Sequence, residues 1–110
     1  MTFLEMTTAF SQTGGVRIGG GTLLAFNATW PFATFEVADS ELRLRCFWKC
    51  WTFPKSQIIR LSEHHSFSTG LRIQHSVANY TQFIVFWTFG FAKLRRALEE
   101  NGYKVYDHAA

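Results

Sequence analysis

The chain has 110 residues, of which 47% are hydrophobic and 17% aromatic, and its formal net charge is +3. This length predicts one domain, because either half alone would bury too little apolar surface to be stable. The apolar content argues against extensive disorder. No run reaches the ~18 apolar residues that a spanning helix needs, so no transmembrane segment is expected. The first residues lack a basic leader, which predicts a cytoplasmic location.

Polar residues and glycines dominate the N-terminal part of the chain. Residues 1–15 are irregular and end in Thr-Gly-Gly, which predicts a flexible tail without function. A short strand is expected over 16–18. The glycine triplet at 19–21 is not followed by the lysine that a phosphate-binding loop needs, so we expect a plain loop. The domain then extends over 16–106, and 107–110 form a C-terminal tail.

Strand patterns are clearest in the middle of the chain. Residues 34–37 and 42–46 alternate apolar and polar side chains, which predicts a β-hairpin turning at Asp39-Ser40. Each strand should place one face on a core and the other in solvent. Pro31, just before the hairpin, suits a strand entrance or edge, where its missing N–H costs least. Further short strands are expected over 51–53, 58–61 and 71–75.

The segment 83–87 is apolar at every position. In a sheet, Ile84 and Phe86 would face one side and the other three residues the opposite side. Both faces must be covered, either within the domain or by a partner. Because one helix cannot shield everything, we expect Ile84 and Phe86 to contribute to an interaction surface, with a symmetric homodimer as the simplest arrangement.

After Gly90 the apolar residues follow a helical period. Those on one side of the predicted helix are Phe91, Leu94, Ala97 and Leu98. Charged residues fall on the other side, and Asn101-Gly102 offers a glycine suited to a left-handed C-terminal position. The sequence therefore predicts one helix of about three turns whose apolar stripe lies against the sheet.

Short strands followed by one amphipathic helix is the order seen in pleckstrin-homology-like domains, and this chain resembles that class. There the helix closes one end of a partly open antiparallel β-barrel of about seven strands. The chain is also similar to small bacterial proteins with no assigned activity, on the segments Trp-Pro-Phe-Ala-Thr-Phe-Glu-Val (30–37), Phe-Pro-Lys-Ser-Gln-Ile (53–58), Gly-Leu-Arg-Ile (70–73) and Phe-Ile-Val-Phe-Trp-Thr (83–88). The resemblance implies a mostly-β fold with one C-terminal α-helix and leaves the function open.

Many eukaryotic relatives of that fold bind phosphoinositides through a lysine on the first hairpin strand and a basic pair on the second. Arg43 and Arg45 match the basic pair and are candidate anion contacts. Glu36 stands on the first strand, where its charge would repel a phosphate. We therefore expect no specific phosphoinositide binding.

Sequence motifs for catalysis and metal binding are not recognisable. Cys46 and Cys50 would lie ~13 Å apart on an extended strand, beyond disulfide reach unless residues 47–49 form a tight turn. They also lack the two-residue gap of zinc and redox motifs. We therefore favour free thiols over a metal site in which His64 and His65 are additional ligands. These two histidines are expected to lie in a solvated loop. His75 falls on the same side of its predicted strand as the core residues, and one hydrogen bond would satisfy its buried side chain. No catalytic residue, metal or cofactor is predicted.

Aromatic and basic residues mix between 43 and 55, as they do in some nucleic-acid-binding proteins. The charge is too sparse to favour that function, and no nucleic-acid partner is expected. Strand alternation predicts ordinary core filling, with Trp48 inside, Phe47 outside and Trp51 as a second ring that could be exposed. These three rings are candidates for an interaction surface.

Three functions stay open at this point. The favoured hypothesis is a non-catalytic interaction module that binds another protein or self-associates. The alternative is peripheral binding to an anionic lipid or membrane surface, which the net charge and the Arg43/Arg45 pair suggest and Glu36 opposes. The third is a small enzyme, which would need a cluster of polar groups in a pocket.

Overall fold

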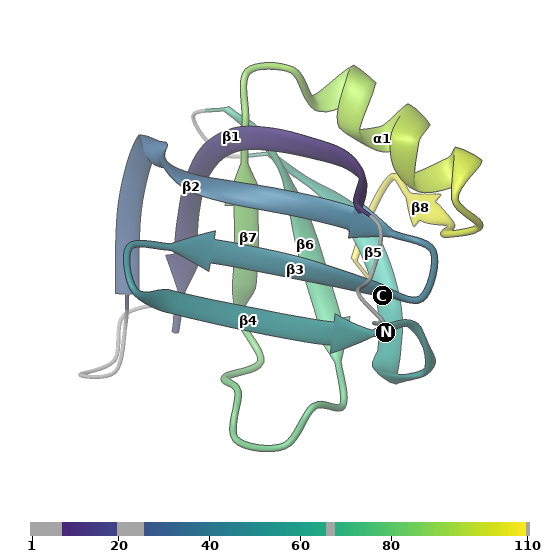
Figure 1. Cartoon of the computed structure of the whole chain (residues 1–110), viewed down its shortest axis with the longest axis horizontal. Coiled ribbons are helices and arrows are strands. Elements are labelled where there is room, and N and C mark those ends of the chain that lie inside the picture. The colour runs from purple at the N-terminus through teal and green to yellow at the C-terminus, as the bar shows by residue number, and fades with distance from the viewer. Residues whose placement is uncertain (1–7, 20–25, 66–67, 110) are drawn as a thin grey trace, which may run out of the picture.

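Eight strands and one α-helix make up the described part of the chain, residues 8–19, 26–65 and 68–109 of this computed structural model (Figure 1). In chain order the elements are β1 (Thr8–Ile18), β2 (Phe26–Ala38), β3 (Glu41–Cys46), β4 (Lys49–Pro54), a 3₁₀ turn (Lys55–Gln57), β5 (Ile58–His65), β6 (Thr69–His75), β7 (Ile84–Trp87), α1 (Phe91–Glu100) and β8 (Val105–Tyr106). None of the described helices has the length and apolar character needed to cross a membrane.

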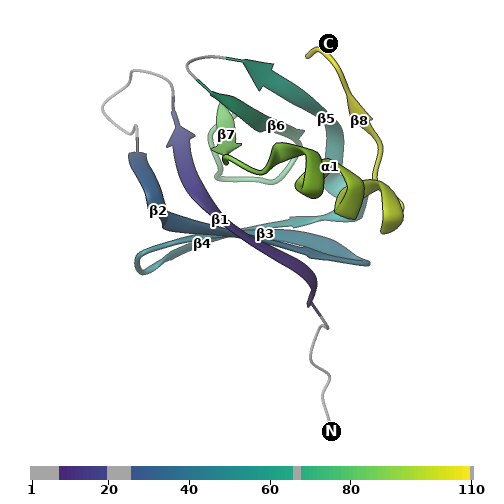
Figure 2. The same cartoon turned by 90° about the horizontal axis from the view of Figure 1, so that it is seen from above.

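The described strands form one sheet in the order β4-β3-β2-β1-β7-β6-β5-β8. Neighbours are antiparallel, except that β5 and β8 are parallel. β1 curves and joins the two parts of the sheet, because its second half pairs with both β2 and β7 (Figure 2). The mostly-β class with one helix near the C-terminus is confirmed. The sheet is nevertheless open, whereas a partly open barrel was expected. It also has eight strands where about seven were expected, because β8 is too short to leave a pattern in the sequence.

The predicted hairpin is β2 and β3, which turn at Asp39-Ser40. Phe35, Leu42 and Leu44 have no accessible surface, while the polar residues between them face outward. Alternation therefore separates a core face from a solvent face in both strands, as the sequence predicts.

β7 lies at the centre of the sheet, between β1 and β6, and its first three residues are buried. Ile84 and Phe86 are fully buried in the core, where the Phe86 ring stacks on Phe35 with centroids 5.1 Å apart. Val85, on the other face, lies in register with neighbouring strands on both sides and is 3% exposed. The prediction that Ile84 and Phe86 belong to an interaction surface was wrong, because the domain itself covers both faces of β7.

The N-terminal boundary also differs from the prediction, since residues 8–15 belong to β1 and are not a tail. In the sequence, Gly14 and Gly15 suggest a turn. In the structure, both residues lie inside β1. A Cβ on Gly14 would meet the Trp87 carbonyl oxygen at 2.1 Å, so β1 approaches β7 too closely for a side chain there. Residues 1–7 and most of the predicted loop at 19–21 lie outside the described residues.

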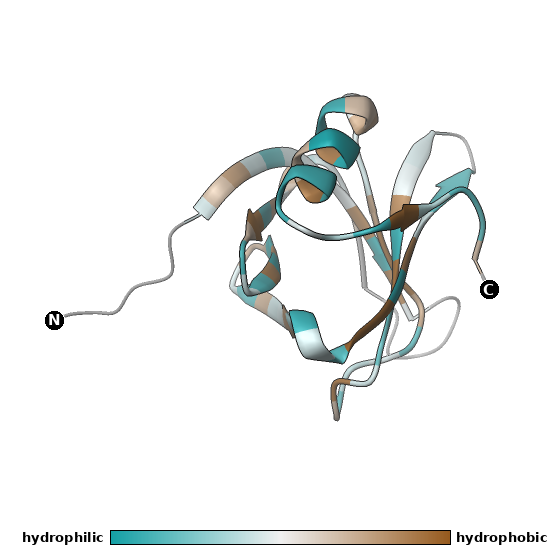
Figure 3. Cartoon of the chain, turned by 90° about the vertical axis from the view of Figure 1, so that its right-hand side faces the viewer, coloured by the Kyte–Doolittle hydropathy of each residue, from teal (hydrophilic) through white to brown (hydrophobic). Residues whose placement is uncertain are grey.

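Helix α1 packs its predicted stripe against the sheet, and Figure 3 shows its hydrophobic side turned inward. The buried residues of the helix are Phe91, Leu94, Ala97 and Leu98. The helix ends at the predicted glycine: Gly102 has a φ of 86°, and the Tyr103 N–H donates to the Leu98 carbonyl oxygen at 2.9 Å.

Arg95 connects α1 to the C-terminal segment that follows it. Its guanidinium donates to the Val105 carbonyl oxygen at 2.8 Å, to Asp107 at 3.0 Å, and to Glu63 on β5. The hydrogen bond from Arg95 and its positive charge lower the pKa of the Asp107 carboxyl below its usual range. Asp107, predicted as the start of a tail, is thus attached to the domain through Arg95.

We predict that Leu98→Ala lowers the free energy of unfolding by about 2–5 kcal/mol, because Leu98 is fully buried between α1 and the sheet. Denaturant unfolding followed by circular dichroism measures the change. Glu100→Ala, an exposed position on the same helix, is the control and should leave the midpoint nearly unchanged. An equal effect of the two substitutions would show that the helix is not docked on the sheet.

Candidate interaction surface

Large apolar side chains are exposed mainly on one part of the molecule. Six of the described large hydrophobic residues are exposed, and five of them are aromatic, in two groups of contacting rings: Trp30 with Phe89, and Phe47 with Phe32 and Trp48. With half-buried Trp87 they form what we call the aromatic surface: Trp30, Phe32, Phe47, Trp48, Trp87 and Phe89. Clustered exposed rings are the usual mark of an interaction site.

An interruption of the β1–β2 ladder exposes the first two rings. The register jumps from Gly14–Ala33 to Val16–Ala28, so residues 29–32 have no partner on β1. Trp30 and Phe32, two residues apart within this interruption, are 46% and 52% exposed. Pro31 lies between these two rings. It was predicted at a strand entrance or edge but lies inside the long strand β2. Its missing N–H is not needed where the ladder is broken.

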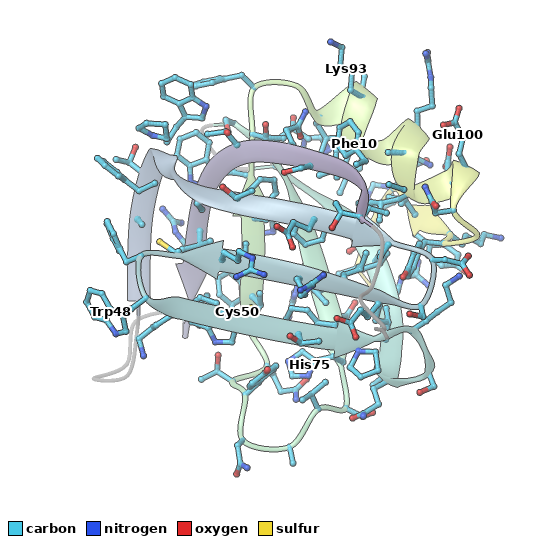
Figure 4. All side chains as sticks on the ribbon, viewed as in Figure 1. Phe10, Trp48, Cys50, His75, Lys93 and Glu100 are labelled. Atoms are coloured by element: carbon cyan, nitrogen blue, oxygen red, sulfur yellow. The ribbon has the colours of Figure 1, made fainter. Side chains whose placement is uncertain are left out.

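The turn between β3 and β4 exposes the next two rings. Phe47 has a φ of 56°, a left-handed conformation that costs a bulky residue about 1 kcal/mol. Strand alternation stops at this turn, so Trp48 is 82% exposed, although the alternation predicts it inside. Figure 4 shows Trp48 at the edge of the molecule, remote from the helix that carries Lys93 and Glu100. Phe47 is exposed as predicted, whereas Trp51 is half-buried against the core.

Trp87 completes the aromatic surface from the outer face of β7. It lies in register between Gly15 on β1 and Gly70 on β6, which leave room for its ring. The Phe89 ring meets Trp87 edge-on with centroids 5.6 Å apart, and the Trp30 ring lies 6.0 Å from Phe89. Trp30, Phe32, Trp87 and Phe89 were not among the predicted surface residues. In residues 34–37 the even-numbered side chains are polar and are predicted to face solvent. The same alternation, continued backwards along the strand, places Trp30 and Phe32 on that exposed face.

Lys49 follows Trp48 directly and brings positive charge to the aromatic surface. The segments that carry the six rings, 28–34, 45–51 and 84–93, contain no aspartate or glutamate. They contain three basic residues, of which Lys49 adjoins Trp48, whereas Arg45 pairs with Glu36 at 3.2 Å and Lys93 lies on α1, remote from Trp48. A partner with negative charge would therefore complement this part of the molecule.

The predicted anion contacts, Arg43 and Arg45, lie on the outer face of β3. Glu36 on β2 is 3.5 Å from Arg43 Nε and 3.2 Å from Arg45 Nε, and Glu41 is 3.4 Å from Arg43 Nε. These carboxylates offset the positive charge that the two arginines would present to a phosphate. The structure therefore separates the aromatic surface from the basic pair that the sequence singles out.

The outer edge of β4 is protected against pairing with another strand. The Thr52 N–H donates to the hydroxyl oxygen of Tyr80 at 2.9 Å, so this N–H is not offered to a partner. Pro54 ends the strand and has no N–H to donate. An added strand is thus disfavoured along the Thr52–Pro54 part of this edge.

The cysteines do not form a site. Cys46 is buried in the core and Cys50 is exposed on the neighbouring strand, and both are free thiols. Burial raises the pKa of the Cys46 thiol. Within residues 8–19, 26–65 and 68–109, no three His, Cys, Asp or Glu side chains are placed to hold a metal ion.

The histidines differ in environment. His64 and His65 lie in β5, not in the predicted loop. His65 Nε2 is 3.1 Å from Glu63, whereas burial and the charges of nearby Arg72 and Arg17 lower the pKa of His64. His75 is buried as predicted, and two hydrogen bonds satisfy it. Its Nδ1 accepts the Val77 N–H at 3.0 Å, so Nε2 carries the proton and donates to the Thr81 carbonyl oxygen at 2.9 Å.

Comparison with known proteins finds no match to a family model, to a curated protein or to a solved structure. Function is therefore inferred from the exposed rings and the charges around them.

We predict that the two thiols react at very different rates with a disulfide reagent. Cys50 should react within the mixing time of an ordinary assay, because its sulfur is exposed. Cys46 should react only on unfolding, because it is buried and its raised pKa keeps the thiol protonated. Cys50→Ser is the control that leaves only the slow phase. A fast phase in that variant would contradict the burial of Cys46.

Proposed function

We propose that this protein is a non-catalytic interaction module that docks reversibly on an anionic lipid surface through the aromatic surface. The exposed Trp48, at the tip of the β3–β4 turn, is the observation that carries the proposal. Tryptophan and phenylalanine favour the boundary between lipid headgroups and acyl chains, and the neighbouring basic residues favour anionic headgroups.

The expected energies suit weak, reversible attachment. Burying the Phe47 and Trp48 rings contributes about 1.5–3 kcal/mol each. Each lysine or arginine near an anionic surface adds about 1 kcal/mol, which salt screens. Lys49, next to the two rings, is the basic residue best placed for this role. No single contribution anchors the protein permanently, so binding should depend on lipid charge and ionic strength.

Self-association, the function that the sequence favours, has less support. Its main argument was the exposure of Ile84 and Phe86, which are buried. A two-fold interface through the aromatic surface would also place the basic residues of one copy near those of the other. Glu36 offsets the charge of Arg45, and the ring-bearing segments themselves supply no carboxylate.

The pleckstrin-homology-like class remains part of this proposal. Seven strands followed by a helix agree with the class that the sequence resembles. The parallel strand β8 and the open sheet depart from it. The pairing of Glu36 with Arg43 and Arg45 supports the expectation that phosphoinositides are not bound specifically.

We predict that Trp48→Ser weakens binding to phosphatidylglycerol-containing vesicles about ten- to a hundredfold, because one inserted ring is lost. Flotation with vesicles of mixed phosphatidylglycerol and phosphatidylcholine measures the bound fraction. Ile59→Ser is the matched control, since Ile59 is 67% exposed but lies on β5, outside the aromatic surface. It should leave the bound fraction unchanged.

Three outcomes would contradict the proposal. The first is equal binding to vesicles of phosphatidylcholine alone, and the second is an equal effect of Trp48→Ser and Ile59→Ser. The third is a dimer in light scattering, without vesicles, that Trp48→Ser converts to a monomer, because self-association would then account for the exposed rings. Vesicles matched in charge but containing a phosphoinositide should bind no better than phosphatidylglycerol.

A further inference from the structure

A pocket of about 200 Å³ lies between β5 and the segment that follows α1. Three basic residues from separate parts of the chain line it, together with two tyrosines and an exposed isoleucine: Lys55, Arg60, Lys104, Tyr103, Tyr106 and Ile59. None of its lining residues is acidic. Figure 1 places β5 and β8 on the side opposite the β3–β4 turn, so this pocket is separate from the aromatic surface.

Aromatic rings and backbone carbonyls position the three basic side chains. Lys55 Nζ donates to the Asn101 carbonyl oxygen at 3.0 Å and lies 4.4 Å from the centre of the Tyr103 ring. The Arg60 guanidinium stacks 3.7 Å from the centre of the Tyr106 ring, and Lys104 Nζ lies 5.0 Å from the same centre. These contacts hold the cations in place without neutralising them.

The arrangement leaves positive charge without a carboxylate counterpart. Among the described residues, Lys55, Arg60 and Lys104 form no salt bridge, whereas Arg95 pairs with three carboxylates. Like charges that line one pocket repel one another, and a bound anion removes that repulsion. The tyrosine rings and the β5 isoleucines supply an apolar wall beside the charges.

We propose that this pocket binds a soluble organic phosphate monoester with a small apolar group. Two negative charges on the phosphate match the three basic side chains that line the pocket better than the single charge of a carboxylate does. Arg60 Nε and Nη2 donate to the His108 carbonyl oxygen at 3.1 Å and 3.0 Å, so Arg60 offers a phosphate its Nη1 side, and Lys104, the most accessible of the three, adds a point charge. The small volume limits the apolar group to about the size of one ring, which would lie against Ile59.

Phenyl phosphate is the probe, and benzoate and inorganic phosphate are its matched comparisons. Titration of the full chain, followed by backbone amide NMR shifts, should move the amides of residues 58–61 and 102–106. Phenyl phosphate should bind more tightly than benzoate, which lacks the second charge, and than inorganic phosphate, which lacks the ring. No vesicle is present in this titration, so its result does not depend on the lipid-binding proposal.

Lys104→Gln should weaken phenyl phosphate binding about tenfold, because one charge-assisted contact is lost. Lys93→Gln, which removes an exposed lysine from α1, is the control and should leave binding unchanged. Ile59→Ser should weaken phenyl phosphate more than inorganic phosphate. Lys104→Gln should not change vesicle flotation, because the pocket faces away from the aromatic surface.

Several results would overturn the proposal. These are an absence of shifts in the pocket amides at millimolar phenyl phosphate, equal affinity for benzoate, or equal weakening by Lys104→Gln and Lys93→Gln. Flotation with phosphatidic acid vesicles distinguishes a lipid headgroup from a soluble ester. A loss of flotation in Lys104→Gln, without binding of phenyl phosphate, would assign the pocket to lipid phosphate and reject the soluble ester.

Discussion

The close approach of three strands at Trp87 is the constraint on which both the core and the aromatic surface depend. Gly15 on β1 and Gly70 on β6 flank this residue. A Cβ on Gly15 would lie 2.6 Å from the Trp87 side chain, and a Cβ on Gly70 would lie 3.1 Å from it. Because the strands meet here without side chains between them, Phe86 can stack on Phe35 inside while Trp87 supports Phe89 outside. β7 therefore contributes to the centre of the core through Phe86 and to the aromatic surface through Trp87.

Periodic segments were predictable because burial on one face imposes a repeat on the sequence. The alternation over 34–37 and 42–46 indicates the β2–β3 hairpin, and the spacing after Gly90 indicates α1, down to its terminal glycine. These elements bury their own apolar face against the sheet, so local sequence carries enough information. β8 has two residues and owes its place to Arg95 and to β5, neither of which lies beside it in sequence.

The aromatic surface was only partly predictable, since it is assembled from three separate segments. Phe47 and Trp48 are visible in the sequence as adjacent rings, but alternation predicts Trp48 inside because it cannot detect a two-residue turn. Phe89 follows β7 and joins Trp30 only through the sheet order, which places β7 two strands from β2. Ile84 and Phe86 were misplaced for the same reason: a central strand covered on both sides looks identical, in sequence, to one that needs a partner.

The distribution of charge separates two surfaces that can act together. Carboxylates pair with arginines on the outer face of β2 and β3, through Glu36, and beneath α1, through Arg95. Neither the segments of the aromatic surface nor the lining of the β5–β8 pocket contains an acidic residue. Both regions therefore favour anionic partners, and the β3–β4 turn and the β5–β8 pocket lie toward opposite ends of the eight-stranded sheet. A membrane that covers Trp48 leaves the pocket around Lys104 open to solvent, so both proposed ligands can be bound at once.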